Sequence, residues 1–374
     1  MLSRSCLRIA LDIKSNNNFY KKMGCLPIIN LKKELCIMSF NRFVRTTAGS
    51  SLLAACLTFS PVTHAGLMFN FTFSGAFLDG ASGAARQGAM INAGNLFSTM
   101  FGSHFTNMAT LDFNATGSDN PLSDTLASAG SNAMIAAGFG AGEVVLNKLL
   151  SNGAIDLNGA AADGSVDVNF GAAWELDPNV NPVGPAQFDF FAAIFHELTH
   201  ALGFSSGITP AGDDGDGNGN NGSAGTWSKF DQFMTNCGSG SLINPGNFQT
   251  NQGVYDAAKT TGMCFNGANA LAANGGNQVD LYAPNPYSQG SSGSHLNTDN
   301  PAYATSMMKH NRDFGNEARN YSAIEIGILA DLGYTRVTAN NVPEPGTLAL
   351  FVGAAIAGFM ARRRKSRCQA TSVI

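Results

Sequence analysis

Charged side chains are scarce in this 374-residue sequence, in which Asp, Glu, Lys and Arg make up only 13%. They are also unevenly spread, because residues 66–341 hold 23 of the 26 acidic residues but only 8 of the 22 basic ones. A body this acidic repels phosphate backbones, which argues against a nucleic-acid-binding protein. Glycine is instead abundant, with 43 residues. This composition suits a β-rich or loop-rich extracellular protein better than a helical cytosolic one.

The apolar run near the C-terminus, residues 347–361, is shorter than the roughly 20 residues that cross a bilayer comfortably. It follows Pro343, Glu344 and Pro345 and precedes a basic cluster at 362–365. This order of features resembles the PEP-CTERM sorting signal of Gram-negative bacteria. The resemblance implies export, recognition of the tail by exosortase-type machinery, transient membrane association and removal of the tail. A plain membrane anchor is the alternative, and both interpretations place the body of the protein outside the cytoplasm.

The other end of the chain has the pattern of a secretory signal peptide. It begins at Met38 with two arginines, continues with an apolar segment over 48–62, and ends in small residues before the expected cleavage after Ala65. Residues 1–37 fit no part of such a signal, which makes Met38 a candidate for the true start. The alternative is a lipoprotein cleavage box, with Cys56 lipidated.

Cysteine is nearly absent from the body of the protein. Of seven cysteines, only Cys237 and Cys264 lie within residues 66–341. Their wide spacing, with no histidine between them, does not fit a structural zinc site. Two cysteines in an exported domain more often form one disulfide than two free thiols, so we expect a Cys237–Cys264 disulfide.

Apolar periodicity predicts both strands and helices. Alternation of apolar and polar residues predicts strands over 69–73, 108–113 and 165–174. Apolar residues at three- and four-residue spacing predict helices over 82–101, 187–204 and 321–332. The helix over 187–204 is apolar on nearly every side, so we expect it in the core, with Gly203 providing the turn that ends it. Residues 205–300 are rich in Gly, Asn, Ser and Asp, and we expect loops there that the disulfide holds in place.

The apolar helix over 187–204 carries His196, Glu197 and His200. Histidines four residues apart lie on one helix face, one turn apart, where two imidazole nitrogens can share a zinc ion. Glu197 lies beside them, placed to take a proton from a zinc-bound water and pass it to the leaving amine. The alternative, ordinary core histidines, is disfavoured because unpaired polar groups are costly in so apolar a helix. The pattern therefore predicts zinc-dependent hydrolysis of peptide bonds, with Glu197 as the catalytic base.

A catalytic zinc ion needs a third protein ligand. No glutamate lies between Leu198 and Asn316, which argues against a thermolysin-like arrangement with a glutamate on a nearby downstream helix. Apart from the helix pair, the histidines after Ala65 are His104, His295 and His310, of which His104 is most simply a surface residue. An aspartate could also provide the ligand, and the candidates are Asp213, Asp214 and Asp231.

The segment from His196 to Gly203 resembles the metzincin motif H-E-x-x-H-x-x-G-x-x-H, but Ser206 stands where that motif has its third histidine. The leishmanolysin-like branch of the metzincins has a long insertion here. In that branch a histidine, a methionine turn and a helix ending in Asp-Leu-Gly-aromatic then follow. This chain has the same order, and its last helix ends in Asp-Leu-Gly-Tyr at 331–334.

The resemblance implies that His295 is the third zinc ligand, with His310 as the fallback. It also implies that Met308, rather than Met307, is the methionine that lies under the zinc. The insertion between His200 and His295 is longer than is expected for the branch.

A weaker pattern lies inside the insertion. Asp214, Asp216 and Asn218, followed by Gly219, resemble the start of a calcium loop, which needs oxygen ligands at alternate positions. The glutamate expected at the twelfth position is replaced by Gly225. A flexible polar loop is the main interpretation, and a structural Ca²⁺ is the alternative.

Together these features predict an α+β fold with a metzincin-like catalytic domain over 66–335: a twisted sheet, two core helices and a loop-rich C-terminal half. The predicted flanking regions are an N-terminal extension with signal peptide over 1–65, a linker with the PEP motif over 336–346, and a hydrophobic sorting helix with a basic tail over 347–374. The expected function is that of an exported zinc-dependent endopeptidase, a monomer acting on protein or peptide substrates. The alternative is a non-catalytic extracellular matrix or metal-binding surface protein on the same fold, although the presence of Glu197 favours the enzyme.

Overall fold

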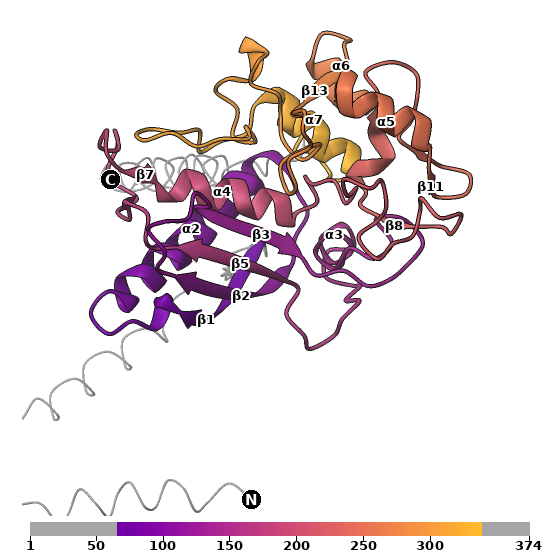
Figure 1. The fold of residues 1–374 in the computed structure, drawn as a ribbon. Coiled ribbons are helices and arrows are strands. Elements are labelled where there is room, and N and C mark those ends of the chain that lie inside the picture. The colour runs from indigo at the N-terminus through magenta and orange to yellow at the C-terminus, as the bar shows by residue number, and fades with distance from the viewer. Residues whose placement is uncertain (1–65, 339–374) are drawn as a thin grey trace, which may run out of the picture. The chain divides into compact units, whose positions relative to one another are not determined.

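The computed structural model describes residues 66–338 (Figure 1). The predicted signal peptide, the PEP motif and the sorting helix lie outside the described residues. Among the described helices, none combines the length and the hydrophobicity that a membrane span requires.

The main sheet has four strands in the order β1-β2-β5-β3. Their bounds are β1 Met68–Gly75, β2 Thr110–Ser118, β5 Gly164–Asn169 and β3 Ala127–Ser131. The first three run parallel, whereas β3 runs antiparallel to β5 and forms one edge of the sheet. Residues of β2 alternate between the core and the opposite face, and Leu111, Phe113 and Ala115 are buried. This alternation is the physical basis of the predicted strand, although β2 begins two residues later than predicted and continues to Ser118.

Two helices, α2 (Gly83–His104) and α4 (Phe190–Ala201), pack on the sheet and on each other. Phe97 of α2 is fully buried, and its ring meets Phe69 of β1 and Phe195 of α4 at centroid distances of 5.9 and 5.6 Å. Figure 1 shows α4 lying between the main sheet and the part of the chain that carries α5, α6 and α7. The apolar helix that the sequence predicts is therefore at the centre of the molecule.

The start of α4 differs from its predicted start at residue 187. Residues Phe188–Asp189 form the short strand β7, which pairs with β6 (Trp174–Glu175). The Asp189 carboxylate then accepts a hydrogen bond from Ala192 N at 3.0 Å and caps the helix, so the helical hydrogen bonds begin at Phe190. After the helix, Gly203 has φ +101°, the left-handed conformation that glycine adopts readily.

The remaining elements are short. The helical ones are η1 Ala76–Leu78, α3 Val144–Leu150, η2 Phe230–Phe233, α5 Gln252–Thr261, α6 Ala268–Ala273, η3 Pro301–Tyr303 and α7 Ala323–Leu332. The short strands besides β6 and β7 are β4 Gly138–Phe139, β8 Thr226–Trp227, β9 Met234–Thr235, β10 Ile243–Asn244, β11 Gln249–Thr250, β12 Met263–Phe265 and β13 Val279–Leu281. The described residues thus form a mixed α+β fold with one four-stranded sheet and several small ones.

The predicted loops make up most of residues 205–300, but this region also has regular elements that were not predicted. This region contains α5, α6 and a three-stranded sheet in the order β13-β12-β9, and it has its own buried side chains, such as Tyr255 and Phe265. Its apolar residues are too few and too widely spaced to show a period, so their burial depends on contacts between distant segments. The predicted disulfide between Cys237 and Cys264 is present and joins the turn after β9 to β12, with a Cα–Cα distance of 4.8 Å.

The strand predicted over 165–174 is also interrupted, since β5 ends at Asn169 and β6 starts separately at Trp174. The helix predicted over 321–332 is α7. Its start has a capping box in which Ser322 and Glu325 bind each other's backbone N–H groups, and Gly333 ends it in the left-handed conformation. The Tyr334 hydroxyl donates to Leu202 O at 2.7 Å and so ties the end of α7 to the end of α4.

Candidate metal centre

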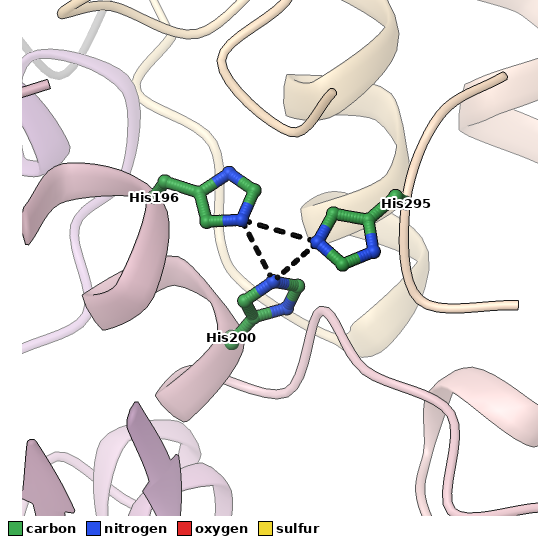
Figure 2. A group of neighbouring side chains, drawn as sticks. All are labelled: His196, His200 and His295. Carbon is green, nitrogen blue, oxygen red and sulfur yellow. Dashed lines mark hydrogen bonds between the residues drawn. The ribbon is translucent and has the colours of Figure 1, made fainter. Parts of the chain in front are cut away.

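Three imidazole rings converge where α4 meets the second half of the chain. His196 and His200 extend from one face of α4, and His295 comes from a loop 95 residues after His200 (Figure 2). Their Nε2 atoms lie 3.0 Å (His196–His200), 3.1 Å (His200–His295) and 3.2 Å (His196–His295) apart. Nitrogens at roughly 2.05 Å from one tetrahedral zinc ion would lie about 3.3 Å apart, so the three rings are spaced as ligands of a single ion.

The hydrogen bond made by Nδ1 of each ring determines which of the two ring nitrogens carries the hydrogen. Nδ1 of His196, His200 and His295 lies 2.8, 2.7 and 2.9 Å from the carbonyl oxygens of Met307, Phe204 and Ser291. A carbonyl oxygen can only accept, so each Nδ1 donates and a neutral ring has its lone pair on Nε2. Three lone pairs then point at one another, an arrangement that a cation among them stabilises.

Burial keeps these rings neutral. It lowers the pKa of His196 well below its usual value, that of His200 to about 4 and that of His295 to about 3. His196 and His295 are only 5% and 6% exposed. Neutral, desolvated imidazoles with free Nε2 lone pairs are the form in which histidine binds a metal ion.

Glu197 lies beside the three rings, with Oε1 at 3.9 Å from His196 Nε2. Its other oxygen, Oε2, accepts a hydrogen bond from Ala129 N of β3 at 3.1 Å. Burial raises the pKa of Glu197 to about 8, against the opposing effects of the Arg312 charge and the Ala129 hydrogen bond. A divalent cation on the histidines would lower this pKa and favour the carboxylate.

The loop with His295 is held against the end of α4. Ser294 Oγ accepts a hydrogen bond from Ser206 N at 3.0 Å, and Tyr282 N donates to His295 O at 2.8 Å. Ser206, the residue that replaces the third histidine of the metzincin motif, therefore lies next to the segment that supplies His295. The Ser206 hydroxyl itself donates to Asp231 Oδ1 at 2.6 Å.

The remaining candidate ligands are not in the group of converging side chains. His310 lines the same cleft, but its ring is stacked on Tyr282 with a centroid distance of 3.6 Å. Both oxygens of Asp231 accept hydrogen bonds, from the Ser206 hydroxyl and from Gly207 N and Ser228 N. Asp213 accepts from Thr209 Oγ1 and Gly215 N. His104, which is partly exposed, lies 2.8 Å from Asn320 Oδ1 through its Nε2.

The weak calcium pattern forms a polar turn. Asp214 Oδ1 accepts from Asp216 N and Asn218 N, and its Oδ2 accepts from Thr226 N at 2.7 Å. Backbone hydrogen bonds thus account for the position of this carboxylate, and Ca²⁺ binding there stays a prediction.

Met307 and Met308 are both fully buried next to the rings. The Met307 carbonyl accepts from His196 Nδ1, and Leu296 N, which follows the third histidine, donates to Met308 O at 2.9 Å. The segment predicted as the methionine turn therefore lies against both His196 and the His295 loop. Which of the two sulfur atoms lies under a metal ion stays a prediction.

The rings and Glu197 open into a cleft of about 920 Å³. Residues of β3 line the cleft, as does Phe314, whose exposed ring packs on Phe188 with a centroid distance of 4.3 Å. Because hydrogen-bonding directions alternate along a strand and Ala129 N points to Glu197, Ala127 directs its N–H and C=O to the same side. The register with β5 agrees, since Asn169 N donates to Leu126 O and the next facing pair, Ala127 and Val168, is then a non-hydrogen-bonded pair.

Sequence reasoning did not identify several residues of this site. Ala129 and Phe314 carry no chemical signal of their own. Arg312, which also lines the cleft, could have been noticed as one of only eight basic residues in 66–341 and as a near neighbour of the two methionines. It donates to the Met307 carbonyl through Nη2.

Comparison with known proteins identifies the tail of the chain only. Residues 341–365 match the family model of the PEP-CTERM protein-sorting motif. No curated protein and no solved structure matches the chain. The motif implies recognition by exosortase-type sorting machinery, and it indicates a secreted or cell-surface protein of a bacterium.

Proposed function

We propose that this protein is an exported zinc-dependent endopeptidase. The observation that carries the proposal is the convergence of three neutral imidazoles, each with a free Nε2 lone pair, next to a carboxylate on the wall of an open cleft. The sorting motif supports a site of action outside the cytoplasm, on the surface or in the extracellular matrix of a Gram-negative bacterium.

The residues fit zinc better than the harder divalent cations. Three imidazole nitrogens suit zinc, whereas Ca²⁺ and Mg²⁺ prefer oxygen ligands. Three protein ligands also leave a coordination position open, as in catalytic zinc sites. When bound, zinc supplies Lewis acidity, which polarises a peptide carbonyl and lowers the pKa of water to about 7.

Glu197 would act as the proton carrier of the reaction. Its Oε1 faces the histidines, while the Ala129 N–H holds Oε2 and fixes the rotamer of the side chain. A carboxylate in this position can take a proton from the attacking water and deliver it to the leaving amine. Oε2 is therefore held by β3, and Oε1 is available for proton transfer.

The free edge of β3 supports a peptide as the substrate. The N–H and C=O of Ala127 can pair with an extended backbone, as in other peptide complexes that add a strand to a sheet edge. Such a peptide would pass Glu197 and the three rings beside Ala129, in a cleft that Phe188 and Phe314 also line.

The resemblance to leishmanolysin-like metzincins supports the same conclusion. The chain has the features of this branch in the expected order: the third histidine, the paired methionines and the Asp-Leu-Gly-Tyr end of the last helix. In the structure, His295 and Met307 lie against His196, and Tyr334 binds the end of α4. A metzincin-like fold is thus part of the proposal.

The test is to measure bound metal and hydrolysis of casein for the purified protein and for Glu197→Gln. We expect one zinc ion per chain in both proteins and a decrease in kcat of roughly 10²–10⁴-fold in the variant, the usual contribution of a general base. Zinc binding without any Glu197-dependent hydrolysis would instead point to a metal-binding surface protein. A protein that binds no zinc would point to a non-catalytic matrix component.

A further inference from the structure

One peptide group beside the candidate metal centre is held at both of its polar ends. It joins Met307 to Met308. Its N–H, on Met308, donates to Glu325 Oε1 at 2.7 Å. Its C=O, on Met307, accepts from His196 Nδ1 at 2.8 Å and also from Arg312 Nη2. The orientation of this peptide therefore determines the direction of the hydrogen bond that His196 makes.

Glu325 links the peptide to the start of α7. The side chain is fully buried, and its second oxygen accepts from Ser322 N at 2.6 Å as part of the capping box. One carboxylate thus accepts hydrogen bonds from two different segments. Because the donor on this second oxygen is the backbone N–H of Ser322, Glu325 holds Met308 N in a defined place.

Arg312 holds the opposite end of the same peptide. Its side chain is 11% exposed, and its nearest carboxylate oxygen, Glu317 Oε2, is 3.7 Å from Nη1. Nε and Nη1 are buried and have no hydrogen-bond partner within the described part of the chain, so the bond to the Met307 carbonyl is the hydrogen bond that fixes the guanidinium there. A buried guanidinium with two unpaired donors lowers the stability of the folded protein.

We propose that Arg312 and Glu325 are positioning residues of the metal centre. They hold the Met307–Met308 peptide so that its carbonyl keeps the hydrogen of His196 on Nδ1 and aims Nε2 at the other two rings. This inference rests on the proposed metal binding and adds the residues that orient its first ligand. Partners that orient a ligating histidine typically change metal affinity by 10–100-fold when they are replaced.

The experiment measures zinc affinity by competition with a chromophoric chelator, using the purified chain and three variants. Arg312→Met removes the donor at nearly the same length, and Arg312→Lys restores a positive charge but cannot reproduce the guanidinium geometry. We expect zinc binding about 10–100-fold weaker in Arg312→Met and an intermediate value in Arg312→Lys. If Arg312→Met does not fold, the decision rests on Arg312→Lys.

Ser322→Ala is the matched control for stability. It removes the hydroxyl that caps α7 but keeps the backbone N–H that binds Glu325. We expect it to lower the melting temperature of the zinc-free protein without changing zinc affinity. Wild-type zinc affinity in both Arg312 variants would overturn the inference, as would an equal loss in Ser322→Ala. If the unaltered protein itself binds no zinc, the proposed function fails and this inference fails with it.

Discussion

The Glu197→Gln substitution is expected to stabilise the zinc-free protein at neutral pH. Glutamine is close in shape to a protonated glutamate, and its oxygen can still accept the hydrogen bond from Ala129 N. The substitution therefore removes one property of Glu197, its ability to ionise, and leaves packing nearly unchanged. A residue that stabilises the fold would give the opposite result.

The size of the effect follows from the pKa. Burial raises the pKa of Glu197 from 4.5 to about 8 in the folded protein. Above pH 4.5 the unfolded chain releases this proton while the folded protein retains it, so stability falls as pH rises toward 8. At 1.36 kcal/mol for each pH unit, the wild type loses about 3 kcal/mol between pH 4.5 and pH 7 relative to the glutamine variant.

The assay is denaturant unfolding of both proteins with a chelator present, at pH values from 4.5 to 8. The difference in unfolding free energy is expected to be near zero at pH 4.5 and to reach about 3 kcal/mol in favour of Glu197→Gln at pH 7. The three histidines titrate in this range in the unfolded chain, and so does the buried Glu143 in the folded protein, whose pKa burial raises to about 7. They are present in both proteins, so the difference between the two isolates Glu197.

Added zinc provides the control, because a cation beside the carboxylate favours its ionised form and should shrink the difference. A glutamine variant that is less stable than the wild type at pH 7 would refute the reasoning. A difference that does not change with pH would refute it as well.

Three further outcomes are expected. His295→Ala should abolish tight zinc binding, whereas His310→Ala should retain it, because the His310 ring is stacked on a tyrosine and is not one of the three converging histidines. The zinc content of each variant after dialysis is the measurement, and the reverse pattern would assign the third ligand to His310. Phe314→Ala should raise KM roughly fivefold, about 1 kcal/mol, for peptides with a large apolar side chain but not for alanine-rich ones, and equal effects on both would rule out a role in side-chain recognition. Reduction of the Cys237–Cys264 disulfide, which closes a loop with a sequence separation of 27, should lower the unfolding free energy by about 3.5 kcal/mol in the chain-entropy treatment, and an unchanged denaturation midpoint would contradict this.

Local patterns accounted for the elements that bury one continuous face. The alternating residues of β1 and β2 and the periodic residues of α2 and α7 predicted these elements to within a few residues of their observed bounds. The short strands and helices within residues 205–300 could not be predicted from local patterns, because they are stabilised by contacts between distant segments. The strand β3 was missed for a related reason: its sequence, Ala-Ser-Ala-Gly-Ser, has no large apolar residue to reveal a period.

The sequence by itself determined the pairing of His196 and His200 with Glu197, because a helix places residues four apart on one face without help from the rest of the chain. It also determined the sorting signal, which is a linear motif. His295 could be named only through a family resemblance, and its approach to the helix pair depends on the path of the chain over a sequence separation of 95 from His200. Only the tertiary structure decided that Arg312, Glu325 and the Met307–Met308 peptide meet at His196, since hydrogen-bond partners from separate segments have no fixed spacing in the sequence.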